Sequence, residues 1–322
     1  MTGEEINREF LLHKEAAYRY AVSILHDSDL ARDATQDLYE KLWRRRLFIR
    51  AKGFRSLMMT AMRNICIDQL RTFERSRSEE LEDQGVDAFC NDDVKELAER
   101  AKQIIATLPL REREVLHLRD CEQMEFCDIV EIVGISEAAA RMACSRARQK
   151  VKDELVKNIL EEIKKQFGQK PLENQNFGKI INQKHFERLL GLIQKEKVVF
   201  GGNSDSQAQR IEPTVMDNVL FSDPVMQEEI FGPIMPILTF ENIDECVTKV
   251  QQMEHPLAFY IFTSNKKLAD RVISLIGFGG GCINDTIIHL ATTQMGFGGF
   301  GESGMGSYHG KVGFDTFSHY KS

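Results

Sequence analysis

The sequence predicts a multi-domain protein with an all-α N-terminal half, which contains two helical domains, followed by an α/β segment. Apolar residues recur at helical spacing through most of the first 166 residues, and no proline interrupts the first hundred. The stretch 79–93 holds seven acids and no base, which indicates a self-repelling linker. Six of the seven prolines lie between Pro171 and Pro256, where short β-rich runs alternate with helical patterns.

These changes in composition set the expected domain limits. We expect a first helical domain over 1–78, the acidic linker over 79–93, a second helical domain over 94–166 and the α/β segment over 167–322. The clearest boundary lies near residue 167, where prolines, glycines and β-rich runs begin together.

The bulk composition excludes several functional classes. The formal net charge of -7 gives the whole chain no gross attraction to nucleic acid, although the bases are concentrated locally. The acidic start lacks the apolar region of a signal peptide, and no apolar run reaches the ~18 residues of a membrane helix. The seven cysteines form no CxxC pair. We therefore expect reduced thiols in a cytoplasm, with no metal site.

The first of two basic stretches along the chain lies in the first helical domain. Residues 43–77 hold ten bases against the two acids Asp68 and Glu74, with aromatic residues between them. Such a surface suits phosphates and unstacked bases. The alternative is that the aromatic residues belong to the core and the charges are solvated. For Trp43 and Phe54 we expect core packing.

Residues 113–152 have the pattern of a helix-turn-helix. The helical stretches EREVLHLRD and EFCDIVEIV precede the turn GIS, where Gly134 permits a tight turn and the Ser136 hydroxyl caps the next helix. That helix has alanines on one face, and five bases against one acid between Ser136 and Lys152. A cationic second helix fits the major groove, whereas the alternative is an ordinary helical pair with a solvated face. The candidate DNA-binding residues are Ser136, Arg141, Ser145, Arg146, Arg148 and Lys150.

Residues 7–156 resemble a bacterial RNA polymerase sigma factor of the small extracytoplasmic-function type. The matching stretches are DLARDATQDLYEKLW, FRSLMMTAMRNICIDQLR, LPLREREVLHLRD and MEFCDIVEIVGISEAAARMACSRARQKVK, in the family's order. The resemblance implies that the chain binds RNA polymerase core and promoter DNA, and it allows an anti-sigma factor as a further partner. The residues that match the polymerase-binding module are Asp33, Gln36, Asp37 and Trp43.

The same resemblance implies how the promoter is read. The minus-10 element would be bound as a single strand, by the helix that carries Arg63, Asn64, Asp68 and Arg71. The helix-turn-helix would read the minus-35 element, and the acidic linker would thread through the polymerase. Alanines replace the family's usual residues after Ser136, so we expect base readout at those positions to be weaker or different.

Residues from about 176 to the end resemble the C-terminal part of an aldehyde dehydrogenase of the class-3, fatty-aldehyde type. The stretches that match include FGKIINQKHFERLLGLI, PVMQEEIFGPIMPI and GFGGFGESGMGSYHGKVGFDTFSH. The resemblance implies that Glu229 binds the cofactor ribose, that Phe231 lies beside the nicotinamide, and that Asn284 and His289 line the substrate end. The glycine-rich stretches match no phosphate-binding loop, and we expect them to form turns.

The match covers an incomplete α/β segment. The family's nucleophilic cysteine, base glutamate and dinucleotide-binding domain all precede the matching part. We interpret Cys282 as a buried structural thiol, and we expect no catalytic residue, and no cofactor unless the remnant still binds NAD or NADP. Without the rest of the family's sheet, this segment would expose a strand edge. A homodimer through the segment therefore stays open as an alternative.

Three functions therefore remain, and the first is favoured. The chain is a promoter-specific sigma factor with an inactive dehydrogenase remnant, an NAD(P)-dependent aldehyde dehydrogenase-related oxidoreductase, or a sigma factor with a nucleotide-sensing module.

Overall fold

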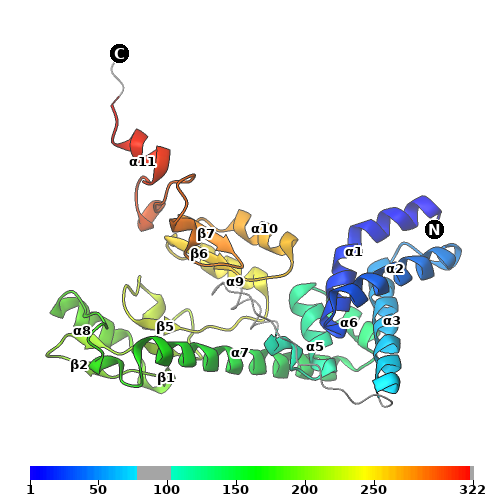
Figure 1. Cartoon of the computed structure of the whole chain (residues 1–322), viewed down its shortest axis with the longest axis horizontal. Coiled ribbons are helices and arrows are strands. Elements are labelled where there is room, and N and C mark those ends of the chain that lie inside the picture. Colours follow the sequence, from blue (N-terminus) through cyan, green and yellow to red (C-terminus); the bar gives the residue numbers. More distant parts are fainter. Residues whose placement is uncertain (78–102, 320–322) are drawn as a thin grey trace.

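The computed structural model describes residues 1–77 and 103–319, and the expected acidic linker over 79–93 lies outside the described residues. Helices fill the N-terminal half, as predicted, and short strands mix with helices in the rest of the chain (Figure 1). The helices discussed below are α1 (Gly3–Leu25), α2 (Ser28–Arg44), α3 (Phe54–Arg77), α5 (Leu110–Leu116), α6 (Phe126–Val133), α7 (Glu137–Phe167), α8 (Gln183–Leu192), α9 (Ile243–Gln251), α10 (Lys266–Leu275) and α11 (Gly310–Thr316).

Local signals begin the first two helices. Thr2 and Glu5 form a capping box at α1, in which the Glu5 amide donates to Thr2 Oγ1 at 3.2 Å and the Thr2 amide donates to Glu5 Oε2 at 2.7 Å. The Asp27 carboxylate accepts from the amides of Asp29 and Leu30 and starts α2. These caps fix where each helix begins, and so which face it buries.

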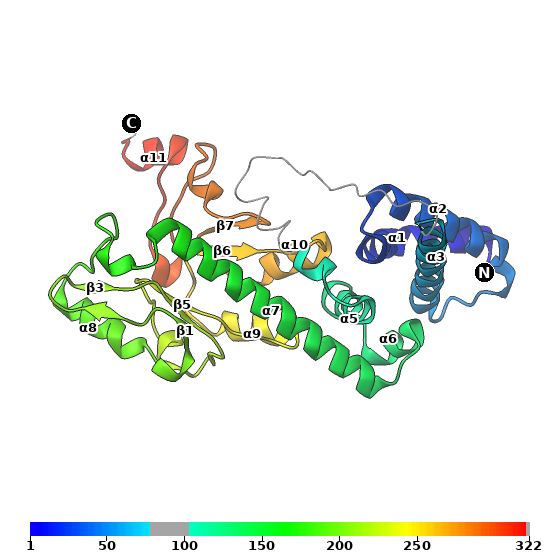
Figure 2. The same ribbon diagram turned by 60° about the horizontal axis from the view of Figure 1, so that its bottom comes forward.

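The two helical units share one hydrophobic core. Tyr20 of α1 and Met62 of α3 belong to the same buried cluster as Val115 of α5 and Ile129 of α6. Figure 2 shows α5 and α6 beside α1 and α3. Because burial of apolar surface is the main favourable term in folding, this shared cluster holds the two units together.

The predicted helix-turn-helix is present between α5 and α7. Gly134 ends α6 with a φ of 73°, in the left-handed region that favours glycine. Ser136 Oγ accepts from the Ala139 amide at 3.3 Å and caps α7. The structure differs from the prediction ahead of α6, because the stretch EREVLHLRD does not remain one α-helix. It changes at His117 into the π-helical turn η2 (His117–Cys121).

The helix α7 is a single element of 31 residues that runs from the helix-turn-helix into the C-terminal segment (Figures 1 and 2). Its first part buries Ala140, Ala143 and Ala147 against the helical half. Gly168, with a φ of 82°, follows its last residue. Because an α-helix has a fixed rise and twist, α7 couples the direction of the C-terminal segment to that of the second helix of the motif.

Short strands form the predicted α/β character of the C-terminal segment. The strands are β1 (Val198–Phe200), β2 (Ser204–Asp205), β3 (Arg210–Ile211), β4 (Thr214–Met216), β5 (Ile234–Pro236), β6 (Ala258–Ile261) and β7 (Gly280–Ile283). In the described residues β4 lies between antiparallel β1 and parallel β5, β2 pairs antiparallel with β3, and β6 pairs parallel with β7. The runs KVVFGG, MPILTF, AFYIFT and GGGCIND each overlap one of these strands, which confirms the α/β prediction.

The cores of the C-terminal segment are small. Phe186 and Leu189 of α8 pack with Ile234 of β5, whereas Val247 of α9 packs with Val272 of α10 in a separate cluster. Many large apolar side chains of the segment stay exposed to solvent, among them Phe231, Phe240, Met305, Phe314 and Phe317. The predicted incomplete α/β segment is therefore confirmed, with large apolar surfaces left uncovered.

Candidate functional site

The residues predicted to bind the polymerase lie on one helix. Asp33, Gln36 and Asp37 are all exposed on α2, one helical turn or less apart. The prediction of a core position for Trp43 is wrong, since its side chain is 39% exposed and lies over the backbone of Gly3. The ring also receives the Arg46 guanidinium, 4.9 Å from its centroid. Phe54, by contrast, is buried as predicted.

The residues predicted to bind the minus-10 element lie on α3 and divide into two sets. Asn64, Asp68 and Arg71 are exposed, with Arg71 Nη1 3.7 Å from Asp68 Oδ1. Arg63 instead faces the second helical unit, where its Nε donates to Glu114 Oε1 at 2.6 Å and its Nη2 to Glu114 Oε2 at 3.2 Å. The Glu114 side chain is 1% exposed, so in this arrangement Arg63 is committed to a protein carboxylate.

The basic face of α7 is present, but its cations have carboxylate partners. Arg146 and Lys150 both reach Glu112 of α5, at 3.4 and 2.9 Å. Arg148 forms a bidentate pair with Asp120 of η2, at 2.9 and 2.6 Å. The side chains of Arg146 and Lys150 are themselves exposed, although the Glu112 carboxylate that they share is 12% exposed, whereas both partners of the Arg148 pair are partly buried.

The start of α7 carries the remaining predicted DNA-binding residues. Arg141 pairs with Glu137 one turn earlier at 2.7 Å and lies over the Phe126 ring, 4.5 Å from its centroid. Ser145 is exposed on the same helix, and the Ser136 hydroxyl is used in the helix cap. The structure therefore brings the predicted basic residues onto one helix, beside the turn of the motif.

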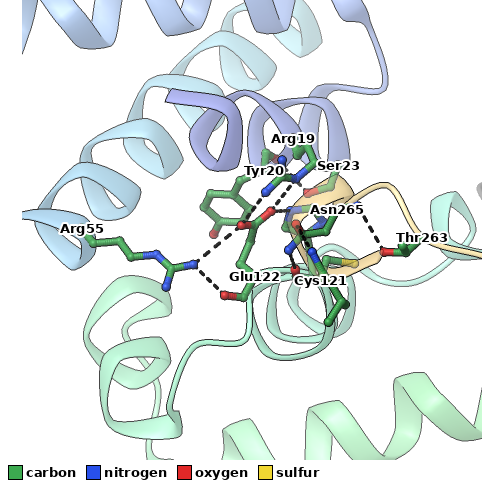
Figure 3. Close-up of polar contacts among 10 residues, drawn as sticks. Arg19, Tyr20, Ser23, Arg55, Cys121, Glu122, Thr263 and Asn265 are labelled. Carbon is green, nitrogen blue, oxygen red and sulfur yellow. Dashed lines mark hydrogen bonds and ion pairs between the residues drawn. The ribbon is translucent and has the colours of Figure 1, made fainter. Parts of the chain in front are cut away.

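Sequence reasoning missed a buried polar cluster between the two helical units. Glu122 directly follows η2, and its carboxylate accepts from Arg19 of α1 at 2.8 and 2.9 Å (Figure 3). Arg55 of α3 donates to the Glu122 carbonyl at 2.6 Å and lies 3.7 Å from its carboxylate. Glu114 accepts in addition from the Tyr20 hydroxyl at 3.2 Å. No spacing rule could reveal these pairs, because the partners lie 51 to 103 residues apart in the chain.

Electrostatics within this cluster favour charged side chains. Burial opposes protonation of His117, but the neighbouring Cys121 and Glu122 outweigh it and raise the His117 pKa to about 9. His117 Nε2 lies 3.5 Å from Glu122 Oε1, an ion-pair distance without hydrogen-bond geometry. Burial raises the pKa of Glu122, yet His117 and Arg19 outweigh it, so the net effect lowers the pKa. The cluster therefore consists of buried side chains of opposite charge. Removing one partner of such a pair destabilises the fold, because the other charge is left buried without compensation.

The two predicted cofactor residues lie on an exposed turn. Arg188 of α8 donates to the carbonyl of Ile230 at 2.7 Å and to that of Glu229 at 3.3 Å, so it holds the backbone of QEEIFGP. Glu229 is exposed, and the Phe231 ring is 84% exposed, with a φ of 46° at this residue. The structure places both side chains in solvent.

Cys282 lies on the predicted strand, β7, but the prediction of a buried thiol is wrong. The residue is half-buried, and its Sγ lies 3.6 Å from His289 Nδ1. His289 is buried between the rings of Tyr260 and Phe297. The buried thiols among the described cysteines are Cys66 and Cys144 of the helical half, and burial raises the pKa of Cys66 to about 12.

Asn284 serves a structural role in this arrangement. Its Oδ1 accepts from the Thr263 amide at 2.7 Å and its Nδ2 donates to the Thr263 carbonyl at 3.0 Å. Asn284 thus ties the end of β7 to the loop before α10, and its side chain is occupied there.

Two classes of site find no support among the described residues. Over 1–77 and 103–319, no three His, Cys, Asp or Glu residues are grouped to hold a metal ion. In the same ranges no helix is long and apolar enough to cross a membrane.

Comparison with known protein families separates the two halves of the chain. A model of sigma-70 region 2 matches residues 10–76, and a model of sigma-70 region 4 matches residues 98–151. A model of the aldehyde dehydrogenase family matches residues 139–322. The last two matches overlap inside the single helix α7, so the two kinds of sequence join within one element.

Individual relatives match the C-terminal half. The chain is similar to 4,4'-diaponeurosporen-aldehyde dehydrogenase of Staphylococcus aureus, at 45% identity over 176 residues, which are 54% of this chain and 38% of the relative. It is 38% identical to the dimeric NADP-preferring aldehyde dehydrogenase of Bos taurus over 172 residues, 53% of this chain and 72% of that relative. A solved structure of substrate-bound Staphylococcus aureus AldH matches with a TM-score of 0.50 and 44% identity, covering 53% of this chain and 39% of that one. Apart from the bovine protein, the chain spans about two fifths of the length of these relatives.

Proposed function

The chain belongs to the aldehyde dehydrogenase family over residues 139–322 and carries sigma-70 region 2 ahead of that match and region 4 overlapping its start, and from this combination we propose that it is a sigma factor. In this role it binds RNA polymerase core and directs it to promoters that have a minus-10 and a minus-35 element. The observation that carries the proposal is the presence of both promoter-reading regions, in order, on one chain. The role places the protein in the cytoplasm with the polymerase.

Exposed side chains on both regions support this role. Asn64 and Arg71 on α3 are exposed where an unpaired strand could meet them, and Arg146 and Lys150 on α7 are exposed cations of the kind that contact phosphates. A sigma factor needs one surface for polymerase as well, and the exposed residues of α2 supply a candidate.

Binding to polymerase core is tested with the full chain and a charge-neutral double variant. We expect Asp33→Asn with Asp37→Asn to weaken the affinity for core polymerase at least tenfold, because both carboxylates are exposed on the face of α2 assigned to the polymerase. Glu245→Gln removes an equally exposed carboxylate from α9 and is the matched control, which should bind like the unmodified chain. A chain that forms no complex with core polymerase would refute the proposal.

The dehydrogenase segment is proposed to be catalytically silent. The chain aligns with about two fifths of the length of its Staphylococcus aureus relative, and the part that the resemblance assigns to the nucleophile and the cofactor domain is occupied by sigma-like sequence. The pure chain should therefore form no NADH or NADPH from fatty aldehydes. Turnover that disappears in Cys282→Ser would overturn this part of the proposal and favour the oxidoreductase.

A nucleotide-sensing role has a specific observation in its favour, namely that Glu229 and Phe231 still project from a turn fixed by Arg188. Titration calorimetry with NAD and NADP separates it from a silent segment. Binding heat that is lost in Glu229→Gln would support sensing, and no heat at millimolar nucleotide would exclude it.

A further inference from the structure

The two promoter-reading surfaces lie side by side in this structure. Ser56 of α3 donates to Asp128 of α6 at 3.0 Å, and Arg141 of α7 lies over Phe126 of the same short helix. A minus-10 and a minus-35 element are about 25 base pairs apart, which is roughly 85 Å of duplex at ~3.4 Å per base pair. Both surfaces cannot reach their elements from this arrangement, so the structure is a closed form that must open on a promoter.

The turn η2 and the residue after it hold the closed form together. Glu122 connects to α1 and α3 through Arg19 and Arg55, and Asp120 connects to α7 through Arg148. Three helices, α1, α3 and α7, therefore connect to a turn of π-helical geometry or to the residue after it, and π-helical turns are uncommon and frequently found at functional sites. Whatever fixes the position of η2 also fixes the contact between the two promoter-reading units.

A side chain of the dehydrogenase segment reaches this turn. Asn265 Nδ2 donates to the carbonyl of Cys121 at 2.7 Å, as Figure 3 shows next to the pairs of Glu122. The loop that presents Asn265 is itself fixed, because the Asn265 amide donates to Thr263 Oγ1 at 3.1 Å and Asn284 binds both backbone groups of Thr263. The contact therefore joins two rigid parts of the chain.

A second contact joins the dehydrogenase segment to a side chain that is paired with η2. Arg148 Nη2, which pairs with Asp120, also donates to the carbonyl of Glu241 at 3.0 Å, just before α9. Arg148 is one of the residues predicted to bind the minus-35 element, so the dehydrogenase segment holds a side chain that promoter DNA would need.

We propose that the dehydrogenase segment and η2 form an intramolecular interaction surface, in which Asn265 braces η2 and so holds the two promoter-reading units closed. The proposal rests on the proposed function for its biological meaning, but the contact itself does not. It gives the segment a role that needs no catalysis: it competes with polymerase and promoter for the sigma-like half.

The test uses hydrogen exchange of the full chain and the variant Asn265→Asp. Asn265 has two separable tasks, because its Oδ1 caps α10 by accepting from the Leu268 amide at 3.2 Å, whereas its Nδ2 braces η2. Aspartate keeps the cap and removes the donor. The reporters are the amides of Glu122 and Met124, which bond to the carbonyls of His117 and Leu118.

We expect exchange at these reporters to accelerate about three- to tenfold in Asn265→Asp, the effect of one lost hydrogen bond on a local opening equilibrium. Asn265→Ser, which also keeps the cap and lacks the amide, should behave alike. Asn182→Asp makes the same change at the cap of α8 and is the matched control, with exchange at η2 unchanged. Unchanged exchange in both Asn265 variants would overturn the proposal.

A second arm, affinity for RNA polymerase core, separates this proposal from the proposed function. If the brace opposes binding, Asn265→Asp binds core polymerase about three- to tenfold more tightly than the unmodified chain. Faster exchange without binding of either protein to polymerase would uphold the brace and refute the sigma factor assignment. Faster exchange with unchanged polymerase affinity would overturn the competition and leave a purely structural contact.

Discussion

At the scale of single residues, buried carboxylates organise the helical half. Glu114 and Glu122 are among the most buried charged side chains described, and each is paired with arginines from the other unit. A buried carboxylate without its partners would lose its compensation for desolvation, so the two units are held in one relative position. The sequence alone shows Glu114 as a member of a helical run and Glu122 as a residue between two such runs, and nothing in their spacing identifies Arg63 or Arg19 as partners.

The ion pair of Glu114 gives a prediction on stability. In Glu114→Gln the amide still accepts from the Tyr20 hydroxyl, but Arg63, at 23% exposure, loses its charged partner. We expect a loss of about 2–4 kcal/mol in the free energy of unfolding of the helical half, measured by urea denaturation. Glu137→Gln breaks an exposed pair with Arg141 and should cost less than about 0.5 kcal/mol. Equal effects of the two variants would contradict the assigned role.

The raised pKa of His117 predicts a dependence on pH. The folded-state value of about 9 lies above the ordinary value of 6.5, so the stabilisation is fully present below about pH 6.5 and is lost as the pH rises through about 9. The groups that face His117 are Cys121 and Glu122 beside it and Tyr20 of α1, whose ring stacks on it at 5.7 Å.

Between pH 6.5 and 9.5 the free energy of unfolding should therefore fall by on the order of 3 kcal/mol. His117→Gln, which cannot titrate, should lose most of this slope. The lowered pKa of Glu122 acts at the opposite end, since its stabilisation is lost as the pH falls below about 4.5. A variant that keeps the full slope between pH 6.5 and 9.5 would show that another group titrates there.

At the scale of elements, the helix-turn-helix was predictable because its signals are local. Gly134 at the turn and Ser136 at the cap each act on neighbouring backbone, so the residue types predict the geometry directly. The π-helical turn η2 was not predictable, since EREVLHLRD has continuous helical periodicity and the change at His117 comes with the burial of Leu118 and Glu122 against the other unit. Long-range packing decided that element.

The cap of α7 gives a prediction at this scale. Ser136→Ala leaves the Ala139 amide without its acceptor, and we expect a loss of about 1 kcal/mol in unfolding free energy together with weaker binding to minus-35 DNA. Ser136→Asp keeps an acceptor at the same place and should retain stability. If alanine and aspartate behave alike in denaturation, the hydroxyl is not the working cap.

At the scale of the whole molecule, α7 joins two kinds of sequence without a linker. Composition predicts the domain limit near residue 167, whereas the family matches meet earlier, within 139–151 of the same helix. Composition marks where prolines and strands begin, but a junction between two helical sequences leaves no such mark. The closed arrangement was likewise beyond sequence reasoning, because it depends on pairs such as Arg19 with Glu122 and on the reach of Asn265.

The central claim is that this chain directs transcription, and run-off transcription by core polymerase on a library of genomic fragments tests it most directly. With the full chain added, we predict transcripts that start at a fixed distance downstream of shared minus-35 and minus-10 sequences. Arg71→Ala with Lys150→Ala should reduce them at least tenfold, while Lys266→Ala, which removes a base from α10 in the dehydrogenase segment, should leave them unchanged. Core polymerase that yields no promoter-specific transcript in the presence of the full chain, or of the opened variant Asn265→Asp, would contradict the account.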